Sequence, residues 1–176
     1  MKKKLIKTER LVIKVIDNED IEDLVNILNN KEIAKTYMLP IFTCKDDVYK
    51  LANRFVSLSN NENKYLYGIY LKDKIIGFVN EVEKDDDIIE VGYVIDPNYQ
   101  NKGYATEMLK EVIKDLFTLG YKKVKAGFFI DNIASKKVME KCNMIKIDFE
   151  EDITYRDKTY HCVYYEITKQ ESLLWS

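Results

Sequence analysis

The stretch DPNYQNKGYATEMLKEV, residues 96–112, connects a predicted strand to a predicted amphipathic helix and decides how this sequence is interpreted. The strand ends at Ile95, Pro97 opens a turn, and Gly103 falls in the first turn of the helix. A helix start exposes several unpaired main-chain N–H groups, with the positive end of the helix dipole behind them. Because Gly103 has no Cβ, a phosphate can approach the main chain closely. The stretch therefore predicts an anion-binding loop, suited to a pyrophosphate.

Two familiar phosphate-binding motifs do not match this stretch. No GKS or GKT follows, so it is not a Walker loop, and it holds one glycine where a dinucleotide fingerprint has three. On the physical argument alone, an ordinary capped helix start competes with phosphate binding. One glycine at a helix start does not separate these two interpretations.

The whole chain has the length and composition of one domain. Its 176 residues are enough to bury a hydrophobic core, and its charges nearly cancel to a formal net charge of -2. This balance gives no reason to expect a nucleic-acid or membrane partner. No apolar run approaches the roughly 20 residues of a membrane helix, and no signal-peptide core follows the initial lysines.

The cysteines and the single histidine give no metal or disulfide pattern. Cys44, Cys142 and Cys162 are widely spaced and odd in number, and His161 has no nearby ligand set. We therefore expect no metal, a reducing cytoplasmic location, and cysteines that are buried as small hydrophobic residues. The acidic run at 85–87 is expected to be a solvated hairpin turn rather than a metal site.

Hydrophobic periodicity predicts an α/β domain with a mixed sheet. Several strands come first, as an antiparallel meander, and strands then alternate with helices. The predicted strands cover residues 9–16, 64–71, 74–83, 88–95, 122–129, 152–155 and 159–167. The predicted helices carry apolar faces at 21–28, 48–56, 105–117 and 132–142. We find no internal repeat, linker or low-complexity segment.

The motif Gln100-x-x-Gly103-x-Ala105, after a V-x-x-P-x-x-Q approach, resembles the acetyl-coenzyme A signature of the GNAT superfamily of N-acetyltransferases. The likeness is closer to its ribosomal-protein N-terminal acetyltransferase branch, the RimJ/RimL type. Four further features spread over nearly the whole chain carry it: Thr8-Glu9-Arg10-Leu11, Ile76-Gly77-Phe78, Glu90-Val91-Gly92-Tyr93-Val94-Ile95 and Asn132-x-x-Ser135-x-x-Val138-Met139-Glu140-Lys141. Together these features are highly specific.

The resemblance implies one domain over residues 1–176, with a core at about 8–168. It implies a GNAT-like fold, in which about four helices flank a central, twisted, mostly antiparallel mixed sheet.

The resemblance also implies an acetyl-coenzyme A site. The main chain of Tyr93, Val94 and Ile95 would pair with the pantetheine arm as an added strand. The main-chain amides of Gln100, Asn101, Lys102, Gly103, Tyr104 and Ala105 would hold the pyrophosphate. Asn132 would bond the pantetheine region, with Ser135 beside it, although Asn132 is equally suited to be a helix N-cap.

The chemistry implied by the resemblance is direct acetyl transfer to a primary amine. An alkyl amine has a pKa of roughly 10, so a proton must be removed before attack. The carbonyl oxygen needs a donor, for which the N–H of Val94 or Ile95 is the candidate, and the thiolate needs an acid.

Many members of the superfamily use a tyrosine as the acid, at the position that is Met139 here. In the RimJ/RimL branch the usual proposal is a serine, here Ser135. The alternative for Ser135 is a first-turn hydroxyl bonded to Asn132 or to the main chain. Glu90 and Glu81 are the candidate bases, although a carboxylate at such a position is more often a solvated strand residue than a base.

The acceptor is the open part of this interpretation. The tyrosines at 155, 160, 164 and 165 either line an acceptor pocket or are ordinary strand residues. The sequence does not separate a peptide N-terminus from a small-molecule amine such as a polyamine or an aminoglycoside.

The alternative to an enzyme is a non-catalytic acyl-coenzyme A sensor or interaction module, which Met139 favours. Members of the family often dimerise, so a homodimer through sheet edges or through the apolar end at 172–176 is a further expectation.

Overall fold

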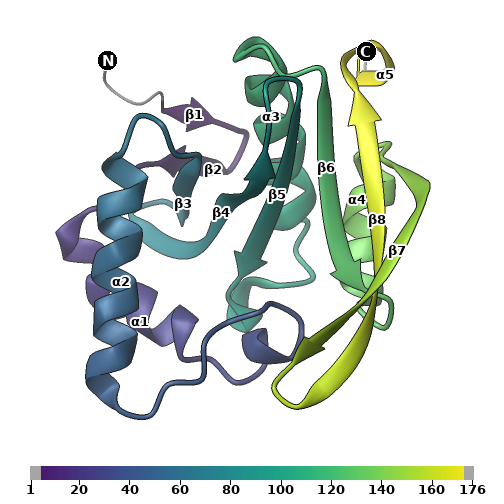
Figure 1. Cartoon of the computed structure of the whole chain (residues 1–176). Helices are drawn as coiled ribbons and strands as arrows, with labels where there is room; N and C mark the ends of the chain where they lie inside the picture. Colours follow the sequence, from purple (N-terminus) through teal and green to yellow (C-terminus); the bar gives the residue numbers. More distant parts are fainter. Residues whose placement is uncertain (1–4, 173–176) are drawn as a thin grey trace. The chain divides into compact units, whose positions relative to one another are not determined.

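The structure is a computed structural model that describes residues 5–172 (Figure 1). The apolar residues Leu173, Leu174 and Trp175, for which a packing role is expected, lie outside the described residues, as do residues 1–4. None of the helices in the described part of the chain is long and apolar enough to cross a membrane.

The strands of residues 5–172 form one eight-stranded sheet in the order β1-β2-β3-β4-β5-β6-β8-β7. Pairing is parallel between β5 and β6 and antiparallel for β1–β2, β2–β3, β3–β4, β6–β8 and β7–β8. The strands are β1 (Ile6–Lys7), β2 (Leu11–Lys14), β3 (Leu66–Leu71), β4 (Lys74–Lys84), β5 (Ile88–Ile95), β6 (Lys123–Phe129), β7 (Ile145–Tyr155) and β8 (Lys158–Thr168). The predicted mixed, mostly antiparallel α/β sheet is confirmed.

Five α-helices lie within the same residues, where about four were expected. The additional helix is α5, a single turn that follows the last strand. The helices are α1 (Ile21–Leu28), α2 (Lys45–Asn60), α3 (Tyr104–Thr118), α4 (Ile133–Lys141) and α5 (Lys169–Ser172). The four longer helices coincide with the four predicted apolar faces.

The chain is organised as two compact units. Unit 1 comprises residues up to 80 together with 93–108, and unit 2 comprises 81–92 and the residues from 109 onward. The chain passes from one unit to the other within β4, within β5 and within α3. Neither unit is therefore a continuous piece of sequence.

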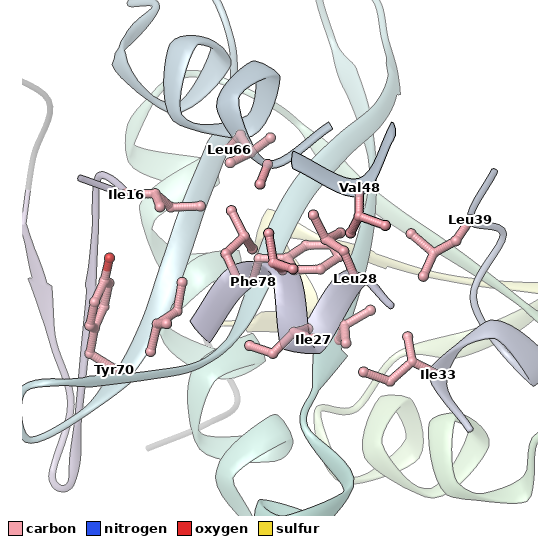
Figure 2. Packing of buried hydrophobic residues seen from close by; sticks show 14 residues of the cluster. Ile16, Ile27, Leu28, Ile33, Leu39, Val48, Leu66, Tyr70 and Phe78 are labelled. Atoms are coloured by element: carbon pink, nitrogen blue, oxygen red, sulfur yellow. The ribbon is translucent and has the colours of Figure 1, made fainter. Parts of the chain in front are cut away.

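The core of unit 1 forms where α1 and α2, which lie side by side, pack on β3 and β4 (Figure 1). Phe78 of β4 is fully buried, with the rings of Tyr37 and Phe55 edge-on at centroid distances of 5.4 and 5.0 Å. Figure 2 shows Phe78 among aliphatic side chains that include Ile27 and Leu28 of α1. Aromatic pairs in this arrangement contribute about 0.5–1.5 kcal/mol beyond the burial of their surface.

Unit 2 has a sheet with two chemically different faces. Along β6, Val124 and Ala126 are fully buried, whereas Lys125 and Gly127 alternate with them on the opposite face. A Cβ on Gly127 would lie 2.4 Å from a ring carbon of Tyr164 on β8. Glycine is therefore required where the tyrosine ring crosses the neighbouring strand.

The turn predicted at 85–87 is confirmed. Asp85 begins the turn between β4 and β5, where its Oδ1 accepts the main-chain N–H groups of Asp87 and Ile88. After α4, Asn143 has a φ of 55°, a left-handed conformation that commonly ends a helix, and the next residue, Met144, is buried.

Two predictions are wrong in part. Cys142 and Cys162 are buried as expected, but Cys44 is exposed, at the residue before α2. The strand predicted at 152–155 begins at Ile145, because the exposed residues of this edge strand lack the alternating apolar pattern that marks a half-buried strand.

Ser59 is a buried polar residue of α2 that connects the segment after β2 to the start of β3. Its hydroxyl accepts the N–H of Ile16 at 2.9 Å and donates to the carbonyl of Leu66 at 3.0 Å. Ser59→Ala leaves both main-chain groups unsatisfied, and we expect a loss of about 2 kcal/mol or more in the free energy of unfolding. Urea unfolding measures this change. Ser57→Ala, at an exposed position of the same helix, should change stability by less than about 0.5 kcal/mol. Equal effects of the two substitutions would contradict this account.

Candidate functional site

The loop between β5 and α3 presents a row of unpaired main-chain donors. After Ile95 the chain forms one 3-10 turn, Pro97–Tyr99, and reaches α3 through Asn101 with φ 60° and Gly103 with φ 81°. Within residues 5–172, no protein acceptor lies within hydrogen-bond distance of the main-chain N–H groups of residues 101–105. Successive N–H groups in left-handed and turn conformations form an anion-binding concavity, and the helix dipole adds to it. Main-chain donors and positive φ values therefore occur together in the loop for which anion binding was predicted.

Side chains of the loop hold its own main chain. Gln100 donates its Nε2 to the carbonyl of Ile95 at 2.8 Å, which connects the loop to the end of β5. Asp96 accepts the N–H of Asn98 at 2.9 Å, and Lys102 Nζ donates to the Asn98 carbonyl at 3.0 Å. The side chain of Gln100, the first residue of the family motif, is thus committed to the protein main chain.

The segment Thr8-Glu9-Arg10-Leu11 contacts the first turn of α3 through Glu107. One carboxylate oxygen of Glu107 accepts from the Thr8 hydroxyl and from Arg10 N at 2.7 Å. The other oxygen accepts from Arg10 Nε at 2.7 Å. Burial alone raises the pKa of Glu107, but the hydrogen bonds from Thr8 and Arg10 outweigh it and hold the pKa below its ordinary value.

The guanidinium of Arg10 extends from Glu107 to the loop. Its Nη1 donates to the carbonyl of Lys102 at 3.0 Å, and its Cζ lies 4.5 Å from the ring centroid of Tyr104. A Cβ built on Gly103 would lie 3.3 Å from Nη2 of Arg10, and no other side chain or main-chain atom beyond its chain neighbours is found within 4 Å among the described residues. Among these residues, the space over Gly103 is otherwise open.

The end of β5 is held tightly against β4. A Cβ on Gly77 would lie 2.0 Å from the carbonyl oxygen of Val94, so no other residue fits at this position. The N–H of Asp96 donates to the carbonyl of Ile76 at 2.8 Å. This contact explains why glycine stands in the Ile76-Gly77-Phe78 motif.

On its other side, β5 pairs with β6 only from Ile88 to Glu90. The main chain of Tyr93, Val94 and Ile95 is therefore not part of that ladder. A strand segment that lies outside a ladder can accept an added strand on that side.

The two candidate bases each lie beside a lysine. Glu90 forms an ion pair with Lys125 at 3.2 Å, and Glu81 forms one with Lys84 at 2.7 Å. Burial raises the pKa of Glu90, and the attraction to Lys125 only partly offsets this effect. Lys125 Nζ also lies 4.1 Å from the ring centroid of Tyr164. The hydroxyl of Tyr164 in turn donates to Glu151, so that phenol already has an acceptor for its proton.

Asn132 and Ser135 form a reciprocal pair at the start of α4. The Oδ1 of Asn132 accepts the main-chain N–H of Ser135 at 3.2 Å, and its Nδ2 donates to the Ser135 hydroxyl oxygen at 2.9 Å. Asn132 is therefore the N-cap of the helix, and Ser135 has the first-turn bond to Asn132 that was one of its two interpretations. Met139 is 1% exposed and lies in the core.

The structure groups the predicted residues within the two units. Unit 1 contains Tyr93, Val94, Ile95 and the loop from Gln100 to Ala105, whereas unit 2 contains Glu81, Glu90, Asn132 and Ser135. In unit 2 the ion-pair partner of Glu90 is Lys125 rather than a residue of the Asn132–Ser135 pair. Within residues 5–172 no cluster of three or more His, Cys, Asp or Glu side chains is placed to hold a metal ion.

Sequence reasoning missed the contacts of Arg10 and Glu107. The motif at Thr8–Leu11 marks the segment as important but gives no role, and Glu107 has the pattern of an ordinary first-turn acid of a helix. A separation of 97 residues between the partners leaves no local signal for their pairing. The only sequence signal is that Glu107 belongs to the helix that follows the loop.

Comparisons with known proteins identify the family and the fold. The acetyltransferase (GNAT) domain family matches residues 10–145. The protein named uncharacterized N-acetyltransferase YoaA of Bacillus subtilis is 25% identical over 171 residues, covering 94% of this chain and 97% of that protein.

Two solved structures show the same fold. A GNAT-family acetyltransferase from Bacillus anthracis has a TM-score of 0.82 at 24% identity, covering 95% of this chain and 99% of its own. RimL, a ribosomal L7/L12 α-N-protein acetyltransferase solved with coenzyme A, has a TM-score of 0.80 at 15% identity, covering 94% and 98%. At these identities both likenesses show the fold alone. Because the family match spans well over half of the sequence, the chain belongs to the GNAT family of acetyltransferases, which use acetyl-coenzyme A.

Proposed function

We propose that this chain transfers the acetyl group of acetyl-coenzyme A directly to a primary amine of a peptide N-terminus or of a small molecule. The observation that carries the proposal is the row of unpaired N–H groups at residues 101–105, above which Gly103 leaves open space. These donors fit a diphosphate, because they converge at a helix N-terminus where negative charge is favoured. Bound acetyl-coenzyme A supplies the reactive thioester.

The main chain at the end of β5 has two roles in this proposal. Tyr93, Val94 and Ile95 lie outside the β5–β6 ladder, and in this proposal the pantetheine arm pairs with their main chain as an added strand. The N–H of Val94 or Ile95 polarises the acetyl carbonyl, whose oxygen gains charge as the amine attacks. The tight packing of Gly77 on Val94 supports this role, because it limits movement of the strand.

Ser135 is the proposed acid for the departing thiolate. Its oxygen accepts a hydrogen bond from Asn132 Nδ2. A hydroxyl that accepts one bond retains its own proton for donation. The same contact orients the hydroxyl, while Asn132 keeps its N-cap bond to the main chain. Asn132 is also the proposed partner of the pantetheine region, and Ser135 lies beside it.

Glu90 is the preferred base of the two candidates, with Glu81 as the alternative. Burial raises the pKa of Glu90, and a base whose pKa lies nearer neutrality removes a proton more effectively. Lys125 provides a fixed cation beside it, at 3.2 Å. A water relay would carry the proton from the amine to this carboxylate.

We further propose that residues 1–176 make up one domain and that the protein acts in the cytoplasm. The three passages of the chain between its two units, inside β4, β5 and α3, support a single domain. If the protein is a homodimer, β7 is the better sheet edge for it, with 11 residues against 2 in β1.

The second candidate function is a non-catalytic acyl-coenzyme A sensor. It is favoured by Met139, which stands at the position of the superfamily's usual tyrosine acid and is buried in the core. This function requires coenzyme A binding without acetyl transfer. An acceptor assay therefore separates it from the enzyme.

The first test is release of free coenzyme A thiol from acetyl-coenzyme A in the presence of an amine panel. The panel contains peptide N-termini, polyamines, aminoglycosides and free amino acids. We expect acceptor-dependent release with one of these classes, which names the substrate class. Bound acetyl-coenzyme A with no release from any class would favour the sensor instead.

Gly103→Val tests the phosphate loop. Valine adds a Cβ over the loop and strongly disfavours the positive φ of this position, so we expect acetyl-coenzyme A affinity to fall at least about tenfold. Gly120→Val is the matched control, because Gly120 also has a positive φ, 110°, and has open space around it. Calorimetric titration measures both variants, each checked for folding by circular dichroism. Unchanged affinity in Gly103→Val would refute the loop assignment.

Ser135→Ala tests the acid. We expect kcat to fall about 100-fold, as for other general acids, with a much smaller change in acetyl-coenzyme A affinity. Ser135→Thr keeps a hydroxyl and should retain most of the activity. Steady-state thiol release measures kcat, and calorimetry measures affinity. Wild-type turnover in Ser135→Ala would exclude Ser135 as the acid.

A further inference from the structure

We infer that Arg10 is a positioning residue for acetyl-coenzyme A, which orients the main-chain N–H of Gly103 by holding the carbonyl of Lys102. The inference rests on the proposed function, because it assigns the 101–105 amides to the diphosphate. Arg10 itself is neither a catalytic residue nor a ligand in this account. It acts through the peptide unit between Lys102 and Gly103.

The direction of the peptide unit follows from its covalent geometry. The Lys102–Gly103 peptide bond is planar and, like every peptide bond among the described residues, trans. In a trans peptide the C=O and the N–H point in opposite directions. Arg10 Nη1 holds the Lys102 oxygen at 3.0 Å, so the N–H of Gly103 points away from Arg10. That direction leaves it unpaired in the structure.

Without an anchor this peptide unit has little to fix it. A glycine occupies positive and negative φ with similar ease, so Gly103 permits the preceding peptide to rotate. Gln100 holds the loop at Ile95, several residues earlier, and the first bond of the helix is from Glu107 N to the Gly103 carbonyl at 3.0 Å. Neither bond constrains the carbonyl of Lys102.

Arg10 is itself held on three sides. Its main-chain N and its Nε bond the two oxygens of Glu107, and its Cζ lies over the ring of Tyr104. The hydroxyl of Thr8 donates to the same carboxylate. A planar guanidinium bonded to two acceptors in fixed directions is oriented in a way that a lysine ammonium is not.

The residue also balances charge beside the loop. Glu107 is a carboxylate in the first turn of α3, where it competes with a phosphate for the positive end of the dipole. The ion pair with Arg10 at 2.7 Å compensates that charge. Arg10 therefore orients one donor through Lys102 and removes a repulsion through Glu107.

The test compares how tightly the Arg10→Met variant binds ligands that contain the diphosphate and a ligand that lacks it. Acetyl-coenzyme A and 3′-phospho-ADP contain the diphosphate, whereas S-acetylpantetheine lacks it. We expect the first two to bind about tenfold more weakly to the variant, the factor for loss of one hydrogen bond to a charged group. The affinity of S-acetylpantetheine should not change. Calorimetry measures the dissociation constants, and kcat at saturating acetyl-coenzyme A should stay at the wild-type value.

Two further variants complete the design. Arg54→Met removes an exposed arginine of α2 and should leave all three affinities at wild-type values. Arg10→Lys cannot reach Glu107 and Lys102 with one fixed geometry, so we expect a smaller but still diphosphate-selective loss. It carries the test if Arg10→Met does not fold.

Three results would overturn the inference. Equal weakening of all three ligands would show a general structural defect, and unchanged affinities would show that Arg10 does not orient the loop. A wild-type protein that fails to bind acetyl-coenzyme A would refute the proposed function and the inference together. Wild-type binding therefore distinguishes failure of the inference from failure of the proposed function.

Discussion

The main-chain N–H groups of residues 101–105 have no protein acceptor among the described residues, and the surrounding contacts of unit 1 keep them so. Unpaired donors are normally costly, and a helix start is the place where a chain exposes several of them together. The side chain of Gln100 satisfies the end of β5 rather than the loop. Gly77 allows β4 to pack on Val94, which fixes the strand from which the loop departs. The glycines and polar residues of the family motif therefore act mainly through the backbone.

Electrostatics around the loop are set by partners rather than by net charge. The chain as a whole has a formal charge of -2, yet the loop offers an anion the helix dipole and main-chain donors. Glu107 would oppose an anion, but Thr8 and Arg10 bond its carboxylate. In unit 2, Lys125 plays the corresponding part for Glu90. Each of these two carboxylates is thus compensated by a cation of its own unit.

Local patterns predict the regular parts of the fold. Helices α1, α2 and α3 carry apolar residues at helical spacing, and the Gln100–Ala105 motif indicates the loop through its residue types and their spacing. The sequence predicts too short a length for the edge strand β7, because its residues are mostly exposed and apolar and polar residues do not alternate along it. Ser135 and Asn132 each have two interpretations, and the capping bond is one of them. The pairing of Arg10 with Glu107 cannot be predicted, because tertiary packing brings together segments far apart in sequence.

The central claim is that the amides of this loop bind the diphosphate of acetyl-coenzyme A. A titration of uniformly ¹⁵N-labelled protein with coenzyme A, followed through the amide resonances of residues 101–105, tests it most directly. Hydrogen bonding to phosphate oxygens should move the resonances of Gly103 and its neighbours together, with one common dissociation constant. If coenzyme A binds while these amides stay unchanged, the diphosphate lies elsewhere and the account of the loop is wrong.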